Sequence, residues 1–434
     1  MAPPIPADES PVLFPEAMPY AEFAKRVQET CLIGDPWYDG HPIFFTSPLV
    51  LPEPFLERVY TAGARVGRLF DELCSVVKKD PDVLDTFYRL PPFYKLMWLA
   101  SEGFWHGFAR MDMFLTDDGT LKIAELNADT PSGQVEALVP AWVLREACAE
   151  LVDVNADYEE RFWRLCLDVH RARTGAEGPP KRALILYPTD LSEDITLIRL
   201  YQRWFEERGL EVELGAPYNL QRTEEGGIAV FGKKIDLVLR HYKTDWWGER
   251  PQIFEGEDPV LDPEPLSKEL FFLLDAERNG KVSVVNPFGA LIPQNKRSMA
   301  FMWEEMARFS EEGQQAIRDL VPETYRLESQ DRERLKREKD QWVLKSDFGC
   351  EGDEVLVGPY TDQETWDWCI DHALEGIWVV QRFFHILPFE DRWLPNYGVF
   401  LIAGAPAGLL VRFAPKSVTT GHDALVVSAF TKRS

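Results

Sequence analysis

Apolar residues near the N-terminus recur at intervals of three and four, the spacing that places side chains on one face of an α-helix. Three segments between residues 16 and 109 show it: EAMPYAEFAKRVQETCL, PFLERVYTAGARVGRLFDELCSVV and PPFYKLMWLASEGFWHGFA. They predict a helical layer over residues 1–109. A second helical stretch runs from about 137 to 173 and ends at Gly175, where the linker GAEGPPK predicts a boundary near residue 178.

The chain changes character after this boundary. A buried strand (RALILYPTD), an amphipathic helix (SEDITLIRLYQRWFEERG) and two more strands (LEVELGAP and KIDLVLRHY) predict a small α/β unit with a parallel sheet over residues 179–285. Residues 286–434 are richer in strands, which we expect at QWVLKSD, DEVLVG, IWVVQRFF, YGVFLIAG and AGLLVRFAP. With residues 110–178 as the remaining unit, the pattern predicts a mixed fold of the α+β or α/β class.

Residues 110–127 predict a β-hairpin. Two alternating runs flank Asp118-Gly119, a strong hairpin signal, and a two-residue loop there would pair Asp117 with Thr120. Counting back along the strands then pairs Asp112 with Glu125, Arg110 with Asn127, and Phe114 with Ile123. One face would carry the polar residues, and the other face would pack on the core with Met111, Met113, Ala124 and Leu126.

This polar face is a candidate metal site. Carboxylates directly opposed on paired strands have Cβ atoms about 5 Å apart, and their like charges destabilise the sheet. A cation such as Mg²⁺ would offset that repulsion, with Asp112, Glu125 and the amide oxygen of Asn127 as ligands. The alternatives are a solvated acidic face and a pair neutralised by Arg110. The loop that follows, residues 128–133, is small and polar, which suits substrate contact.

A second candidate is the segment QWVLKSDFGCEGDEVLVG. Lys345 lies at the end of an expected strand, and a loop with Gly349 and Gly352 follows it. A lysine at this point could neutralise phosphate, helped by the N–H groups of the loop. The alternative is a hairpin with an exposed lysine.

Composition excludes several classes of function. The 434 residues include 47 Lys or Arg and 72 Asp or Glu, for a formal net charge of −25. Such a field repels nucleic acid and anionic lipid surfaces. The sequence contains no apolar stretch of the length that a membrane helix needs. Six scattered cysteines and an N-terminus without a signal-peptide pattern favour a cytoplasmic protein with neither a disulfide framework nor a zinc site.

Taken in order, these segments resemble the ATP-grasp ligases, and most closely the synthetase domain of the glutathionylspermidine synthase family, over about residues 100 to 420. The family's R-x-D and E-x-N-x-D-x-x-S strands match the polar face and the loop after it, and its I-P-x-N-K matches residues 292–296. Because the metal-binding strands precede the lysine strand, the order resembles the circularly permuted ATP-grasp arrangement of this family.

The resemblance implies roles for individual residues. It implies Mg²⁺ on Asp112, Glu125 and Asn127, and ATP on Lys296, Lys345, the loop residues Gly349, Cys350, Glu351 and Gly352, and the strand end Gln381, Arg382 and Phe383. It implies substrate contacts at Arg110, Thr130, Ser132, Thr244 and Arg412. Together with Lys345, the two arginines form the implied catalytic set, because they would stabilise a carboxylate or its acyl phosphate.

An enzyme of this kind would join a small-molecule or peptide carboxylate to an amine, while ATP is cleaved to ADP and phosphate through an acyl-phosphate intermediate. Catalysis would depend on positioning and charge neutralisation, without a covalent nucleophile on the enzyme. Two alternatives from other classes stay open: an ATP-dependent phosphotransferase, and a nucleotide-binding protein without catalysis.

Overall fold

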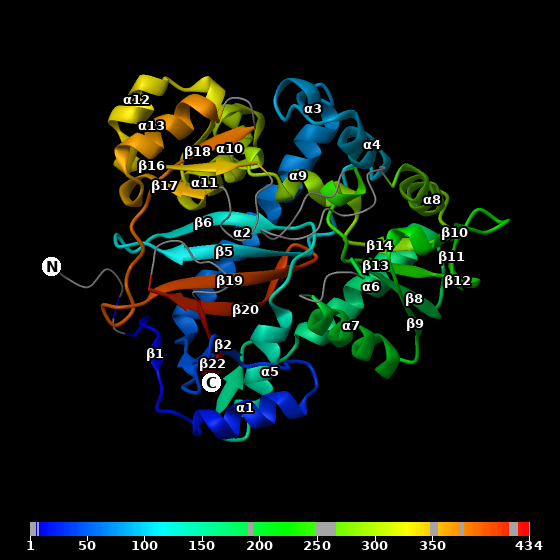
Figure 1. The fold of residues 1–434 in the computed structure, drawn as a ribbon, viewed down its shortest axis with the longest axis horizontal. Helices are drawn as coiled ribbons and strands as arrows, with labels where there is room; N and C mark the ends of the chain where they lie inside the picture. The colour runs from blue at the N-terminus through cyan, green and yellow to red at the C-terminus, as the bar shows by residue number, and fades with distance from the viewer. Residues whose placement is uncertain are drawn as a thin grey trace.

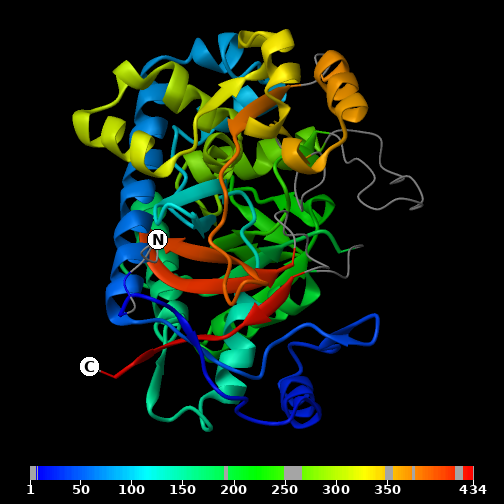
Figure 2. The same cartoon turned by 90° about the vertical axis from the view of Figure 1, so that its left-hand side faces the viewer.

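The computed structural model describes residues 6, 8–189, 194–248, 266–347, 355–373, 377–415 and 424–433. The three N-terminal apolar repeats form helices α1 (Tyr20–Glu29), α2 (Glu53–Lys79) and α4 (Pro92–Ala100), and a short α3 (Val83–Thr86) lies between the last two. Helix α2 buries one face against strands of the central sheet. It lies along one side of the molecule (Figures 1 and 2).

The predicted helical layer also contains short strands that the sequence pattern did not reveal. Strands β1 (Val12–Leu13) and β4 (Leu49–Val50) join β22 (Ala429–Lys432) and β7 (Leu151–Asp153) in one sheet, in the order β1-β4-β22-β7. A separate pair, β2 (Trp37–Tyr38) and β3 (His41–Pro42), lies between them in the chain. Strands of two or three residues are too short to show alternation. The strand that joins β4 to β7, β22, comes from the other end of the chain.

The central sheet combines the predicted hairpin with strands from the C-terminal region. Its order is β21-β20-β19-β5-β6, and every neighbouring pair is antiparallel. The strands are β5 (Ala109–Leu115), β6 (Leu121–Asn127), β19 (Leu394–Ile402), β20 (Ala405–Ala414) and β21 (Leu425–Val427). The hairpin therefore pairs with a strand almost three hundred residues further along the chain, as the adjacent cyan and orange arrows show (Figure 1).

A parallel sheet forms within residues 179–285. It has the order β14-β13-β8-β9, from β8 (Arg182–Leu186), β9 (Glu211–Gly215), β13 (Leu237–Arg240) and β14 (Ser283–Val285). Three helices accompany this sheet: α6 (Tyr158–Thr174), α7 (Ile195–Glu207) and α8 (Ser267–Arg278). Helix α5 (Gln134–Leu144) precedes them in the chain. Helix α6 ends at Gly175, whose φ of +69° suits glycine. A three-stranded sheet is added by β10 (Leu220–Arg222), β11 (Ile228–Val230) and β12 (Lys233–Ile235).

A third antiparallel sheet lies beside the central one, in the order β15-β18-β16-β17. Its strands are β15 (Thr324–Arg326), β16 (Trp342–Ser346), β17 (Val355–Val357) and β18 (Trp378–Arg382). Helices α12 (Arg332–Arg337) and α13 (Gln363–His372) cover it through a small core around Trp342 and Trp366. Helices α9 (Leu291–Gln294), α10 (Arg297–Glu304) and α11 (Glu311–Leu320) connect it to α2. The remaining turns are 3-10 helices at 217–219, 245–247, 288–290, 306–308, 327–329, 339–341 and 358–360.

Candidate active site

The hairpin pairs its polar residues as the sequence predicts, although the turn differs. Asp112 lies opposite Glu125 and Arg110 opposite Asn127, but Phe114 pairs with Lys122 and not with Ile123, so that prediction is wrong. The turn spans three residues between Thr116 and Thr120, whose backbones hydrogen-bond at 2.9 Å, with Gly119 at φ +80°. One additional residue in β6, at Ala124, forms a bulge that restores the predicted register at the polar face.

The bulge also changes what Ala124 faces. The alternating pattern places this residue in the core, whereas it lines a cavity, and Ile123 is the fully buried neighbour. The carbonyl oxygen of Ala124 accepts a hydrogen bond from Nζ of Lys345 at 3.1 Å. An irregularity in the hairpin thus joins the central sheet to the lysine of the third sheet.

The cavity lies between the central and third sheets and has a volume of about 340 Å³. Its polar end carries Asp112, Glu125, Lys345, Gln381 and Asn396. The rest is mainly apolar and aromatic: Phe114, Val343, Val355, Val357, Tyr360, Phe383, Phe384, Ile386, Pro388 and Leu394, together with Ala124, Arg382 and His385. A site with one apolar end and one charged end suits a flat aromatic base attached to phosphates.

Lys345 is held at the polar end by two acceptors. Besides the Ala124 carbonyl, Oε1 of Gln381 accepts a hydrogen bond from its ammonium group at 2.7 Å. Nε2 of Gln381 donates in turn to Oγ1 of Thr324 at 3.1 Å. Burial lowers the pKa of Lys345 to about 8, with a further contribution from Lys296, while Glu125 and Asp112 oppose the shift. The lysine is therefore positioned inside the protein and is not an exposed hairpin residue.

Lys296 approaches the same end from a different element. Its Nζ lies 3.7 Å from Oε2 of Glu125, and Nδ2 of Asn127 donates to Oε1 of that carboxylate at 3.1 Å. The turn that carries Lys296 is tied to the end of β16, because its backbone N–H donates to the carbonyl of Asp347 at 2.9 Å. The side chain of Asn295 donates to the Asp347 carboxylate at 3.2 Å. These bonds bring both lysines to one place.

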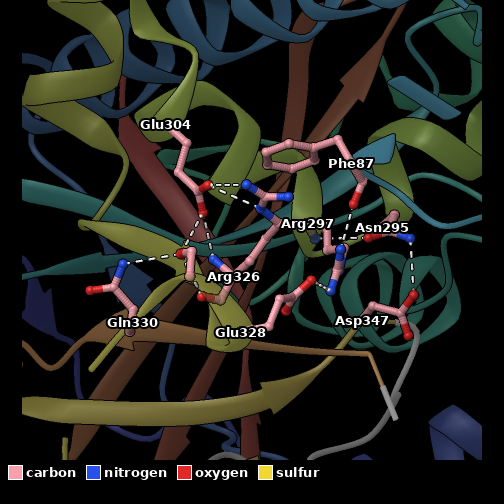
Figure 3. A network of polar contacts seen from close by, with 9 residues as sticks. Phe87, Asn295, Arg297, Glu304, Arg326, Glu328, Gln330 and Asp347 are labelled. Atoms are coloured by element: carbon pink, nitrogen blue, oxygen red, sulfur yellow. Dashed lines mark hydrogen bonds and ion pairs between the residues drawn. The ribbon is translucent and has the colours of Figure 1, made fainter. Parts of the chain in front are cut away.

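The segment after Lys296 is anchored by buried charges (Figure 3). The fully buried guanidinium of Arg297 bonds to the carbonyl of Phe87 and to the carboxylate of Glu328. Arg326 binds Glu304 through two nitrogens, at 3.0 and 2.7 Å. Because these pairs join α10 to β15 and its following turn, the backbone that presents Lys296 is rigid.

Asp112 binds two arginines. Nε of Arg110 donates to Oδ1 at 3.0 Å, and Nη2 of Arg412 donates to Oδ2 at 2.8 Å. Burial alone would raise the pKa of Asp112, but the two guanidiniums and a hydrogen bond from Asn396 hold it at about 2. Neutralisation by Arg110, one of the alternatives from the sequence, is therefore present, with Arg412 as a second partner. Gly398 lies opposite Asp112 and leaves room for Arg110, since a Cβ there would lie 3.2 Å from its Cδ.

The loop after the hairpin connects the central sheet to the α/β unit. The carbonyl of Ser132 accepts a hydrogen bond from Nη1 of Arg110 at 2.9 Å. Asp129 accepts bonds from the backbone N–H and the hydroxyl of Thr244, at 2.7 and 2.6 Å, and from the fully buried Arg240. Thr130 is half-buried. Ser132 therefore lies beside Arg110, and Thr244 shares Asp129 with Arg240. Thr130, Ser132 and Thr244 all lie outside the cavity lining.

The residues fit a divalent cation in part. Within the described ranges, no group of three or more His, Cys, Asp and Glu side chains could hold a metal ion. The two carboxylates that face each other, Asp112 and Glu125, would need amide oxygens to complete a set of hard ligands. Asn127 offers one such group. Asn396 offers a second, because its Oδ1 is buried with no hydrogen-bond partner among the residues that the structure describes.

At the strand end expected to bind ATP, part of the backbone is already hydrogen-bonded within the protein. The backbone N–H groups of Arg382 and Phe383 donate to the carbonyls of Glu323 and Gln341, at 2.7 and 2.8 Å. Their side chains still line the cavity. The predicted glycine-rich loop, Gly349, Cys350, Glu351 and Gly352, lies outside the described residues.

Several residues of the site were missed by sequence reasoning. Asn396 is a polar residue inside the apolar strand LPNYGVFLI, and Arg240 is a charge at the end of a buried strand, so each is a visible exception to its local pattern. Three further cavity-lining residues follow strands and have no such signal: Phe384, His385 and the exposed Tyr360.

Comparisons with known proteins identify a family. A family model described as glutathionylspermidine synthase preATP-grasp matches residues 57–430. The structure of a glutathione synthetase-like effector from Globodera pallida has a TM-score of 0.56 and 11% identity, covering 97% of this chain and 100% of that one. A RimK domain ATP-grasp protein from Sphaerobacter thermophilus has a TM-score of 0.30 and 17% identity, covering 57% and 89%. Only the first is high enough to show a shared fold.

One comparison returns nothing. No curated protein sequence matches the chain. Among the described helices, none combines the length and the apolar character needed to cross a bilayer.

Proposed function

This chain belongs to the glutathionylspermidine synthase preATP-grasp family, and we propose that it is an ATP-grasp ligase that joins a carboxylate to an amine and releases ADP and phosphate. One observation carries the proposal. Two carboxylates and two lysines, from four separate segments, meet at the polar end of a cavity whose other end is apolar. Its substrates would be a small-molecule or peptide acid and an amine.

In this proposal the base of ATP occupies the aromatic end of the cavity and the phosphates reach the polar end. Lys345 and Lys296 neutralise the phosphates as point charges. Asp112, Glu125 and the amide oxygen of Asn127 would hold Mg²⁺, which supplies charge neutralisation to the phosphate oxygens when bound. The metal-binding hairpin precedes the lysine strand in the chain, so we also propose the circularly permuted order of the ATP-grasp elements.

The chemistry needs positioned charges and no enzyme nucleophile. An oxygen of the substrate carboxylate would attack the γ-phosphorus, and the bond from phosphorus to the bridging oxygen of ADP would break. The amine would then attack the acyl carbon, lose a proton, and displace phosphate to leave the amide. Arg110 and Arg412 lie beside Asp112, where they would bind the carboxylate and then the acyl phosphate.

An ADP-release assay tests the function. The purified protein with ATP and Mg²⁺ is screened against pairs of carboxylates and amines, including glutathione with spermidine and short peptides. We expect ADP release that requires both partners, and mass spectrometry should find the amide. ADP release that needs only one phosphate acceptor, with a phosphorylated product, would instead establish a phosphotransferase.

A matched pair of lysine variants locates the activity. Lys345→Met should abolish ADP release, because it removes a charge that faces the phosphates. Lys122→Met, on the same hairpin as Glu125, should retain it, since the Lys122 ammonium bonds to carbonyls of Arg318 and Asp319 and not to the cavity. Calorimetry with ATP and Mg²⁺ tests the alternative of a nucleotide-binding protein without catalysis. ATP binding without turnover in the presence of any tested pair of carboxylate and amine would indicate such a protein.

A further inference from the structure

We propose that Asn396 is an additional ligand of the divalent cation in this site, through its side-chain amide oxygen. The inference rests on the proposed ligase function and extends it to a residue on β19. It adds the third strand of the central sheet to a metal site that the family resemblance places on the hairpin alone.

The first argument is an unpaired buried oxygen. Asn396 is 1% exposed and lines the cavity at its polar end. Its Oδ1 has no hydrogen-bond partner in the part of the chain that the structure describes. Leaving a buried polar atom unpaired destabilises the folded protein, and such atoms are rare in folded proteins. An oxygen that faces a cavity and lacks a protein partner indicates a ligand there.

The second argument is position. Gly398 pairs with Asp112 across β19 and β5, and Asn396 pairs with Arg412 across β19 and β20. Side chains two residues apart on a strand share a face, so Asn396 lies on the same face as Asp112 and Arg412. The Asn396 side chain also hydrogen-bonds to Asp112. Its unpaired oxygen therefore belongs to a side chain that lines the same cavity as the carboxylate proposed to bind metal.

The third argument is the chemistry of the ligand set. Asp112 and Glu125 are the two carboxylates at this end, and Mg²⁺ favours about six oxygen ligands, so neutral oxygens and water must supply the others. Four cationic side chains, from Arg110, Arg412, Lys296 and Lys345, surround the two carboxylates. The net positive charge of these six groups repels a cation, and a triphosphate reverses that field. Metal and nucleotide should bind together.

Binding of Mn²⁺ in place of Mg²⁺ tests the inference without turnover. Electron paramagnetic resonance measures the Kd of Mn²⁺ for the protein in the presence of a non-hydrolysable ATP analogue. We expect Asn396→Leu to weaken Mn²⁺ binding about ten-fold or more, as the loss of a group that supports a metal site does. Asn396→Asp keeps an oxygen and adds a negative charge, so it should bind Mn²⁺ at least as tightly as the wild type.

A second buried asparagine provides the control. Asn286 is also 1% exposed with an unpaired Oδ1, but it does not line the cavity. Asn286→Asp should leave the Kd of Mn²⁺ unchanged, so a gain limited to Asn396→Asp identifies a direct ligand and not a general effect of buried charge.

Two outcomes would overturn the inference. One is an Asn396→Leu protein that binds Mn²⁺ like the wild type but has a raised KM for the acid or amine, because that result makes Asn396 a substrate-binding residue. If the Leu variant does not fold, as judged by circular dichroism, Asn396→Asp decides, and weaker Mn²⁺ binding refutes the proposal. If the wild type binds no Mn²⁺ with the analogue, the proposed ligase function itself fails, which is a distinct result.

Discussion

Removal of the Asp112 carboxylate should destabilise the folded protein as well as abolish turnover. Asp112→Ala deletes the shared acceptor of Arg110 at 3.0 Å and Arg412 at 2.8 Å. Their side chains are only 10% and 15% exposed, so both charges stay largely out of water. Removing one partner of a buried ion pair costs about 3–5 kcal/mol, because it leaves an uncompensated charge. We expect a loss of about that size.

Two comparison variants calibrate this value. Asp112→Asn keeps one acceptor oxygen, so it should lose roughly half as much, in line with about 1.5–3 kcal/mol for one charge-assisted hydrogen bond. Glu125→Ala should lose less than about 1 kcal/mol, because the Glu125 side chain is 30% exposed and its partner Lys296 is 3.7 Å away. Both Asp112→Ala and Glu125→Ala should abolish ATP turnover.

Urea unfolding, followed by circular dichroism in the presence of EDTA, measures these differences without metal. The double variant Asp112→Ala/Arg412→Met should recover part of the loss, because one of the two stranded charges is gone. An Asp112→Ala protein that unfolds at the wild-type urea concentration would refute the reasoning. A double variant no more stable than Asp112→Ala would show that the arginine is not held by this carboxylate.

Three further predictions follow from single contacts. Gly398→Ala places a Cβ 2.9 Å from the Leu410 carbonyl and 3.2 Å from Arg110. In steady-state assays it should raise KM for the acid several-fold with little change in KM for ATP. An unchanged KM for the acid would contradict the idea that the new Cβ displaces Arg110. Gln381→Leu removes an acceptor 2.7 Å from Lys345 and should lower kcat/KM for ATP by about 10–100-fold. Gln381→Glu keeps the acceptor and should retain more activity. Equal losses in the two variants would argue against a role of Gln381 in positioning Lys345. Burial raises the pKa of Glu277 from 4.5 to about 7, so the folded state binds a proton that the unfolded state releases, and stability should fall by about 3 kcal/mol as pH rises through that range. Urea unfolding at pH 5 and pH 8 should show Glu277→Gln gaining on the wild type at the higher pH, and parallel pH profiles would contradict this.

Local pattern was sufficient for the long elements. The apolar repeats that became α1, α2 and α4, and the alternating or apolar runs that became β8, β13, β16, β18, β19 and β20, each contain enough residues for their period to be read. The same reasoning failed for β1, β4 and β7, because two or three residues carry no period. The pairing of β4 and β7 with β22 is decided at long range.

The hairpin shows how a prediction can be right through two errors that cancel. A turn one residue longer than expected shifted the register, and the bulge at Ala124 shifted it back, so Asp112 and Glu125 still face each other. No local signal marks the bulge. It is stabilised where Lys345 binds the Ala124 carbonyl, a contact across 221 residues of sequence.

The amino-acid sequence by itself determined which residues could do chemistry: a polar face on a hairpin, a lysine at a strand end and a second lysine after I-P-x-N. Only the tertiary structure decided what those residues contact, which is why the two arginines around Asp112, the acceptors of Lys345 and the unpaired oxygen of Asn396 came to light there. Side-chain periodicity follows from backbone geometry within one element. The charge, burial and spacing of a site arise from contacts between elements, and these depend on how the whole chain packs.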